Sequence, residues 1–150
     1  MPTIFTIGYE QATQPAVVAA LRDAGVEVLA DVRYLPLSRR PGFSKNSLKA
    51  AVEEAGIVYR HFRDLGTPAD GRAAARRGDH PALSRIYSGQ LELPEALKQM
   101  AELRALAEDT RVCLLCYERN AAECHRALLF DALFADFERV DLEPQLVVAS

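Results

Sequence analysis

The chain has 150 residues, the usual size of one domain and too few for two comfortable ones. Its composition, 49% hydrophobic and 26% charged, is that of a globular protein, and its longest uncharged apolar run, residues 112–117, is far shorter than the roughly 20 residues of a membrane span. No basic leader with an apolar stretch is visible, so the sequence predicts a single cytoplasmic domain over residues 1–150 with no membrane partner.

Secondary structure can be predicted from hydrophobic periodicity together with cap and turn residues. In chain order we expect a strand at 3–7, a helix at 15–24, a strand at 26–32, a helix from Ser44 or Asn46 through Ala55, a strand at 57–59, a loop or short helical excursion at 64–82, a helix at 94–108, a strand at 111–116, a helix at 121–137 and a terminal strand near 146–148.

Strands that alternate with helices of this length favour a single α/β layered domain, with a mainly parallel sheet of about five strands flanked by helices. Folds of this class bind ligands at the carboxyl ends of their strands. The loops that follow Ile7, Val32 and Cys116 are therefore the expected ligand-binding loops.

Charge is unevenly distributed along a chain whose net charge is −3. Residues 33–45 contain four basic residues and no acid, and residues 60–80 contain five arginines against three aspartates. Residues 131–143, by contrast, contain five acids and one arginine. The middle of the chain is therefore expected to form a local positive surface on a protein that is acidic overall.

The segment from Leu115 to Arg126 carries the sharpest chemical pattern. Asn120 and Glu123 have the spacing of a capping box, which predicts a helix that begins near Ala121. Backbone N–H groups without partners at such a helix start favour an anion. In the second turn, helical geometry places Arg126 within the apolar face, His125 on its flank and Cys124 pointing nearly away.

A buried arginine needs an anionic ligand or an acidic partner. Arg126 is therefore predicted either to bind an anion or to form a structural ion pair with Asp31. The sequence favours neither of these two interpretations over the other.

The three cysteines crowd into twelve positions and form no disulfide framework of a secreted domain. Cys116, at a strand end beside a helix start and arginines, is either an activated nucleophile or a small core residue. Strand alternation places Cys113 on the opposite face, in the core. Cys116, Cys124 and His125 lack the spacing of zinc ligands, so we expect no metal and no cofactor.

The segment from residue 31 to residue 45 carries the second pattern. Asp31 and Arg33, two positions apart on a strand, project from the same face into the predicted crevice. Arg39 and Arg40 follow in a proline-rigidified loop beside Phe43, and arginine forks near an aromatic ring suit phosphates and nucleobases. The alternative is an ordinary solvated basic loop.

These segments define one predicted crevice at the carboxyl ends of the strands. Its candidate catalytic residues are Cys116, Glu118 and His125. The residues expected to bind the substrate or anion are Gly8, Tyr9, Asp31, Arg33, Arg39, Arg40 and Arg126.

With these residues in hand, the sequence resembles the family called Domain of Unknown Function 488 over nearly its whole length. The resemblance implies which residues form the site, but the family has no established activity or cofactor that could be assigned to this sequence. It rests on four motifs in order: Thr6-Ile7-Gly8-Tyr9; Asp31-Val32-Arg33 with Pro36 and Ser38-Arg39-Arg40-Pro41-Gly42-Phe43; Leu65-Gly66; and Cys116-Tyr117-Glu118 followed by Cys124-His125-Arg126.

Three functions fit this pattern, and the favoured one is an enzyme acting on a small phosphorylated or nucleotide-like anion. In it Cys116 is the nucleophile, Glu118 or His125 the acid/base, and the arginines hold the anion. Ala122 stands where a tyrosine-phosphatase loop requires an arginine, which excludes that class.

The second function is a nucleic-acid-binding module that uses the 33–45 loop and the arginines of residues 60–77. The third is a non-catalytic domain in which Asp31, Arg33, Glu118 and Arg126 form a structural ion network. The predicted partner is thus a small anionic ligand or a nucleic acid, and the sequence leaves the oligomeric state open.

Overall fold

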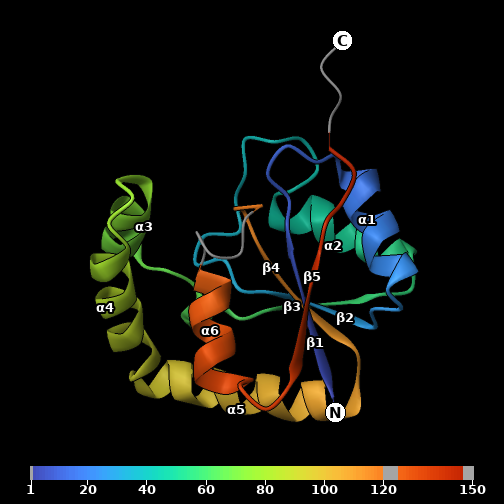
Figure 1. Cartoon of the computed structure of the whole chain (residues 1–150). Coiled ribbons are helices and arrows are strands. Elements are labelled where there is room, and N and C mark those ends of the chain that lie inside the picture. The colour runs from blue at the N-terminus through green and yellow to red at the C-terminus, as the bar shows by residue number, and fades with distance from the viewer. Residues whose placement is uncertain (1, 120–124, 147–150) are drawn as a thin grey trace.

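A computed structural model shows strands that form one parallel sheet, with the helices packed beside it (Figure 1). The structure describes residues 2–119 and 125–146. Its elements are, in chain order, β1 (Thr3–Gly8), α1 (Gln14–Asp23), β2 (Val28–Asp31), α2 (Lys45–Glu54), β3 (Val58–His61), the 3₁₀ turn η1 (Arg63–Leu65), α3 (Ala69–Arg76), α4 (His80–Leu91), α5 (Pro94–Asp109), β4 (Val112–Cys116), α6 (His125–Leu133) and β5 (Glu138–Leu142).

The five strands run parallel in the order β3-β2-β4-β1-β5, which confirms the predicted α/β fold. The central strand, β4, is buried along its whole length, and a strand buried on both faces needs a continuous apolar sequence. Its Cys113 and Leu115 pack with α1 and α2, whereas Val112 and Leu114 pack with α5 and α6 on the other face. Cys113 is therefore a core residue, as predicted.

The connections of β1 and β4 open a crevice beyond the carboxyl ends of these two strands. These two strands are neighbours, but the chain leaves β1 through α1 toward β2 and leaves β4 through α6 toward β5. The helices α1 and α6 pack on opposite faces of the sheet (Figure 1). Where neighbouring strands diverge in this way, a crevice forms beyond their carboxyl ends.

Residues 64–82 were predicted as a loop or a short helical excursion, and the structure instead forms two helices over residues 69–91. Glycine and proline misled the prediction, because here they occupy positions that helices tolerate. Pro81 lies in the first turn of α4, where no backbone N–H is needed, and the side chain of Asp79 caps that turn by accepting from Ala82 N.

The predicted terminal strand near 146–148 lies almost wholly outside the described residues, of which Leu146 is the last. The last described strand is β5, an edge strand beside β1, and Leu146 forms only an isolated bridge with Ala12. No strand was predicted at residues 138–142, and the charged residues on the exposed side of β5 are usual in an edge strand.

The last helix also ends earlier than predicted. It stops at Leu133, four residues before the predicted end, and Phe134 and Phe137 pack edge-to-face beyond it with ring centroids 5.0 Å apart. Its predicted start near Ala121 lies outside the described residues. Among the described helices, none has both the length and the apolar character needed to cross a membrane.

Candidate functional site

A pocket of about 590 Å³ lies at the carboxyl ends of β1, β2 and β4. The loop that follows β2 forms one of its walls, and α3 with the start of α4 forms another. The lining residues are Tyr9, Arg33, Tyr34, Leu35, Leu37, Ser38, Arg39, Arg40, Thr67, Arg72, Ala75, Arg76, Leu83, Cys116, Tyr117, Glu118 and His125.

Seven of the ten predicted site residues line this pocket, and the other three lie beside or beneath it. The three are Gly8, Asp31 and Arg126, and each supports a residue or loop of the pocket wall, as the next paragraphs describe. The lining residues among the ten are Tyr9, Arg33, Arg39, Arg40, Cys116, Glu118 and His125.

Gly8 allows β1 to approach the chain that follows β4. A Cβ atom at this position would lie 1.8 Å from the backbone oxygen of Glu118, so any side chain would displace that loop. Beyond Gly8, the backbone continues in contact with the same loop, since Tyr9 N donates to Cys116 O and Glu10 N donates to Tyr117 O. The glycine therefore places Tyr9 and Glu118 in one wall.

Tyr9 forms a buried aromatic support for the pocket. Its ring stacks on Phe43 at a centroid distance of 4.4 Å and meets Tyr117 edge-on at 5.4 Å. Its hydroxyl accepts a hydrogen bond from Nη1 of Arg33 at 3.2 Å. The ring thus connects the end of β1 to the loop after β2 and to the end of β4.

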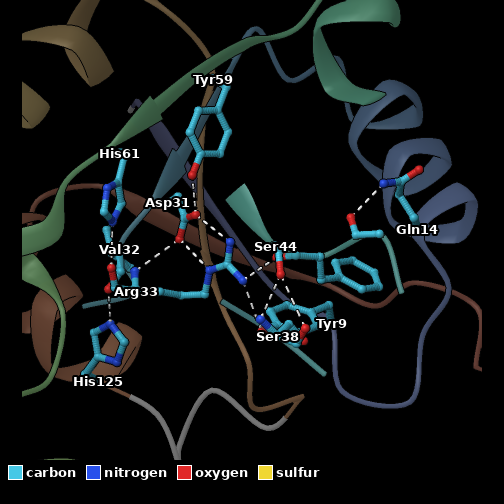
Figure 2. A network of polar contacts seen from close by, with 12 residues as sticks. Tyr9, Gln14, Asp31, Val32, Arg33, Ser38, Ser44, Tyr59, His61 and His125 are labelled. Carbon is cyan, nitrogen blue, oxygen red and sulfur yellow. Dashed lines mark hydrogen bonds and ion pairs between the residues drawn. The ribbon is translucent and has the colours of Figure 1, made fainter. Parts of the chain in front are cut away.

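Asp31 holds Arg33 in place from beneath the pocket (Figure 2). The carboxylate is fully buried and accepts from Nε and Nη2 of Arg33 at 2.8 and 2.7 Å, the two-pronged geometry that arginine prefers. The Tyr59 hydroxyl also donates to Asp31, and burial together with the negative charge of Asp31 raises the pKa of Tyr59 above its usual range. Asp31 therefore positions an arginine and does not line the pocket itself.

The backbone around Arg33 is tied to two histidines as well. His61 contacts the carbonyl oxygen of Arg33 at 2.8 Å, and His125 contacts that of Val32 at 2.7 Å (Figure 2). The His61 ring therefore supports the end of β2.

Cys116 and Glu118 lie at the β4 end of the pocket. The sulfur of Cys116 lies 3.8 Å from a carboxylate oxygen of Glu118. Cys116 takes part in a disulfide bond, which the sequence analysis did not predict, so its thiol exists only after reduction. Cys124, which was predicted to point away from this site, lies outside the described residues.

His125, the first residue of α6, is buried against the end of β2. Since a carbonyl oxygen can only accept, the short contact with Val32 assigns the ring proton to Nε2. Burial, opposed in part by that hydrogen bond, lowers the pKa of His125 to about 4. The imidazole is therefore neutral at pH 7, and Nδ1 is its basic nitrogen.

This burial predicts a loss of stability in mild acid. The folded protein holds His125 neutral down to about pH 4, whereas an unfolded histidine takes up its proton near 6.5. The unfolded state thus binds more protons in this interval, and the contribution of neutral His125 to stability is complete above pH 6.5 and is lost as the pH falls toward 4.

Urea unfolding at a series of pH values measures this effect. His125→Gln removes the titrating group, and we expect its free energy of unfolding to vary less between pH 6.5 and 4 than that of the unmodified protein. An equal pH dependence in the two proteins would contradict the assignment.

Arg126 is buried, as its position on the apolar face of the helix predicted. Its Nη2 donates to the backbone oxygens of Glu118 and Arg119 at 2.6 and 3.3 Å, and its Nη1 donates to the Thr6 hydroxyl. Arg126 therefore fastens the loop after β4 to the sheet. Among the ion pairs that the structure describes, Asp31 pairs with Arg33.

The sequence prediction omitted Arg72 and Arg76 from the site. These residues lie four positions apart on α3, so they project from one helical face with Ala75 between them. Their spacing was visible in the sequence, but the segment was not predicted as a regular helix and the shared face was therefore missed.

Comparison with known proteins gives one match. No curated protein and no solved structure is significantly similar to the chain. The family model described as Domain of unknown function DUF488 matches residues 13–133, which include the strands β2, β3 and β4 and all the described helices. The chain therefore belongs to the DUF488 family.

Proposed function

We propose that this protein is an enzyme acting on a small phosphorylated or nucleotide-like substrate, whose anionic group is held by the arginines of the pocket. The observation that carries this proposal is the charge of the lining: five arginines accompany one carboxylate, Glu118. The pocket volume of about 590 Å³ falls within the usual range for small-molecule sites, and the position at a divergence of strands is typical of them.

The balance of charge in the pocket supports an anionic ligand. Arg33 is neutralised by Asp31, but within the described part of the chain the other four lining arginines form no ion pair. Four guanidinium groups facing one cavity repel one another, and an anion that enters removes this repulsion. Planar guanidinium forks also match the oxygens of a phosphate. The four are Arg39, Arg40, Arg72 and Arg76.

In the proposed mechanism a cellular thiol first reduces the disulfide of Cys116, and the Cys116 thiolate then attacks the phosphorus of the substrate. An S–P bond forms as the P–O bond to the leaving group breaks, and the leaving oxygen takes up the proton that the thiol has given to Glu118. Glu118, 3.8 Å from the sulfur, accepts the thiol proton. His125, which lines the same pocket, is the alternative acid/base. In the reducing cytoplasm that the composition predicts, disulfides are transient, so the thiol is the expected resting form there.

Isothermal titration of the protein with adenosine monophosphate tests the anion site. We expect saturable binding that Arg40→Gln weakens tenfold or more, because a hydrogen bond to a charged group contributes about 1.5–3 kcal/mol. Arg85→Gln is the matched control, since Arg85 is an exposed arginine of α4 that does not line the pocket. Absence of binding, or equal weakening by both variants, would contradict the proposal.

Nucleic-acid binding is the second candidate, favoured by basic groups just outside the pocket. Arg63 stacks over the ring of Tyr34 at 4.1 Å and is half exposed, so it extends the positive surface beyond the lining residues. A single-stranded oligonucleotide that bridges this surface would show a steep fall of affinity with salt concentration. A nucleoside monophosphate that binds tightly with a shallow salt dependence favours the enzyme.

A further inference from the structure

Four arginines of the pocket form no ion pair with any residue that the structure describes, and they come from two different elements. Arg39 and Arg40 belong to the loop after β2 and are called the loop pair below. Arg72 and Arg76 belong to α3 and are called the helix pair. The two pairs are separated in the sequence and are brought to one cavity only by the fold.

The loop pair lies next to the carboxyl end of β4. Nη2 of Arg40 donates to the backbone oxygen of Ala12, which anchors the side chain beside α1. Its charge opposes the rise in the pKa of Tyr117 that burial and Glu10 cause, so Arg40 is close to the residue that follows Cys116. The Nε atom of Arg40 is buried, and within the described residues it has no hydrogen-bond partner.

The helix pair is held on the other wall, away from α1 and α2. Figure 1 shows α3 and α4 as a hairpin on the side of the sheet that carries α6. Gly71 lets α3 pack closely on α4 and on the loop before α3, since a Cβ there would lie 3.2 Å from the Ile86 side chain and 2.5 Å from that of Thr67. Nη1 of Arg72 donates to the Thr67 carbonyl at 3.3 Å, and its guanidinium lies 5.9 Å from the centre of the Tyr34 ring.

Besides the two arginine pairs, the pocket lining includes aromatic and apolar side chains. Tyr34, Leu35, Ala75 and Leu83 face the same cavity, and Leu35 is half exposed although it is apolar. Apolar groups exposed in a concave site are typical of contacts with the body of a ligand. A cavity of about 590 Å³ is also much larger than one phosphate group requires.

We infer that the substrate carries two separated anionic groups, as a nucleoside bisphosphate does. This inference rests on the proposed function and names the substrate class of the same pocket. The loop pair holds the group that lies next to Cys116 and Glu118, where the chemistry takes place. The helix pair holds the distal group, and the aromatic and apolar lining residues contact the body of the ligand. Arg72 and Arg76 are therefore specificity-determining residues that do not touch the reacting atoms.

Titration calorimetry with two probes tests this inference. The probes are adenosine monophosphate and adenosine bisphosphate with one phosphate on each side of the ribose. We expect the unmodified protein to bind the bisphosphate at least tenfold more tightly. The double variant Arg72→Gln/Arg76→Gln should lose that advantage, so that its affinities for the two probes differ by about twofold at most. The double variant Arg39→Gln/Arg40→Gln should bind both probes at least tenfold more weakly.

Controls distinguish a wrong substrate class from a wrong proposed function. Arg77→Gln is the matched control for the helix pair, because Arg77 directly follows α3, is exposed and lies outside the pocket. Thermal unfolding of every variant verifies that it is folded. The inferred substrate class is wrong if the unmodified protein binds both probes with equal affinity, or if the helix-pair variant loses affinity for both probes equally. Either result would leave the proposed anion-binding pocket in place. If neither probe binds, the proposed function fails as well.

Discussion

Asp31→Asn is expected to lower the free energy of unfolding by about 3–5 kcal/mol, the usual cost of breaking a buried ion pair from one side. Asp31 is fully buried and Arg33 is 6% exposed, so the guanidinium cannot turn to water when its partner is neutralised. The asparagine amide also presents N–H groups to an arginine and to the Tyr59 hydroxyl, both of which donate to Asp31.

The protein contains a matched control for this substitution. Arg104 and Asp136 form a second two-pronged arginine–aspartate pair, at 2.6 and 2.7 Å, but the aspartate is exposed to solvent. Asp136→Asn should therefore cost much less, because water screens exposed pairs. Urea unfolding of the two variants measures the difference. Similar losses in both would mean that burial does not decide the strength of the Asp31 pair.

Gly8→Ala is the second substitution with a large expected effect. Its added methyl group would lie 1.8 Å from the Glu118 carbonyl oxygen, and a backbone atom cannot rotate out of the way. Overpacking of this kind usually costs about 1–3 kcal/mol, and here the only relief is displacement of the loop after β4. Because Glu118 lines the pocket, we also expect the affinity for adenosine monophosphate to fall at least tenfold.

Gly89→Ala is the control for this variant. Gly89 lies within α4, and a Cβ atom there meets nothing within 4 Å, so alanine should stabilise the helix by up to about 1 kcal/mol. Thermal unfolding and calorimetry of both variants complete the comparison. A Gly8→Ala protein with normal stability and normal binding would show that the close contact with Glu118 is dispensable.

The sheet and the position of the pocket were predictable from sequence because they depend on patterns within single segments. The apolar run of residues 111–116 can only be a strand buried on both faces, and parallel strands bring their carboxyl ends to one edge. That rule alone placed Arg33 and Cys116 beside one another, and both line the pocket. The burial of Arg126 likewise followed from helical periodicity.

The partners of the buried arginines were not predictable, because they depend on contacts between segments. Asp31 is paired with Arg33, two residues away on the same side of the chain, whereas one of the two interpretations of Arg126 paired it with Asp31. Arg126 instead donates to the backbone oxygens of residues 118 and 119. Every residue has a backbone carbonyl group, so the sequence does not indicate which of them accepts a hydrogen bond. The wall formed by α3 was missed for a related reason, since glycine and proline obscured its helical pattern.

The central claim is that the anion-binding arginines and the Cys116 thiol share one pocket, and chemical labelling tests it most directly. The protein is reduced under native conditions, treated with iodoacetamide at neutral pH and analysed by peptide mass mapping. Cys113 is the internal control, because it is fully buried in the core and burial raises the pKa of its thiol. We predict that Cys116 is labelled much faster than Cys113 and that adenosine monophosphate protects it. A Cys116 that stays unlabelled in the folded, reduced protein, or whose labelling is unchanged by the nucleotide, would contradict the claim.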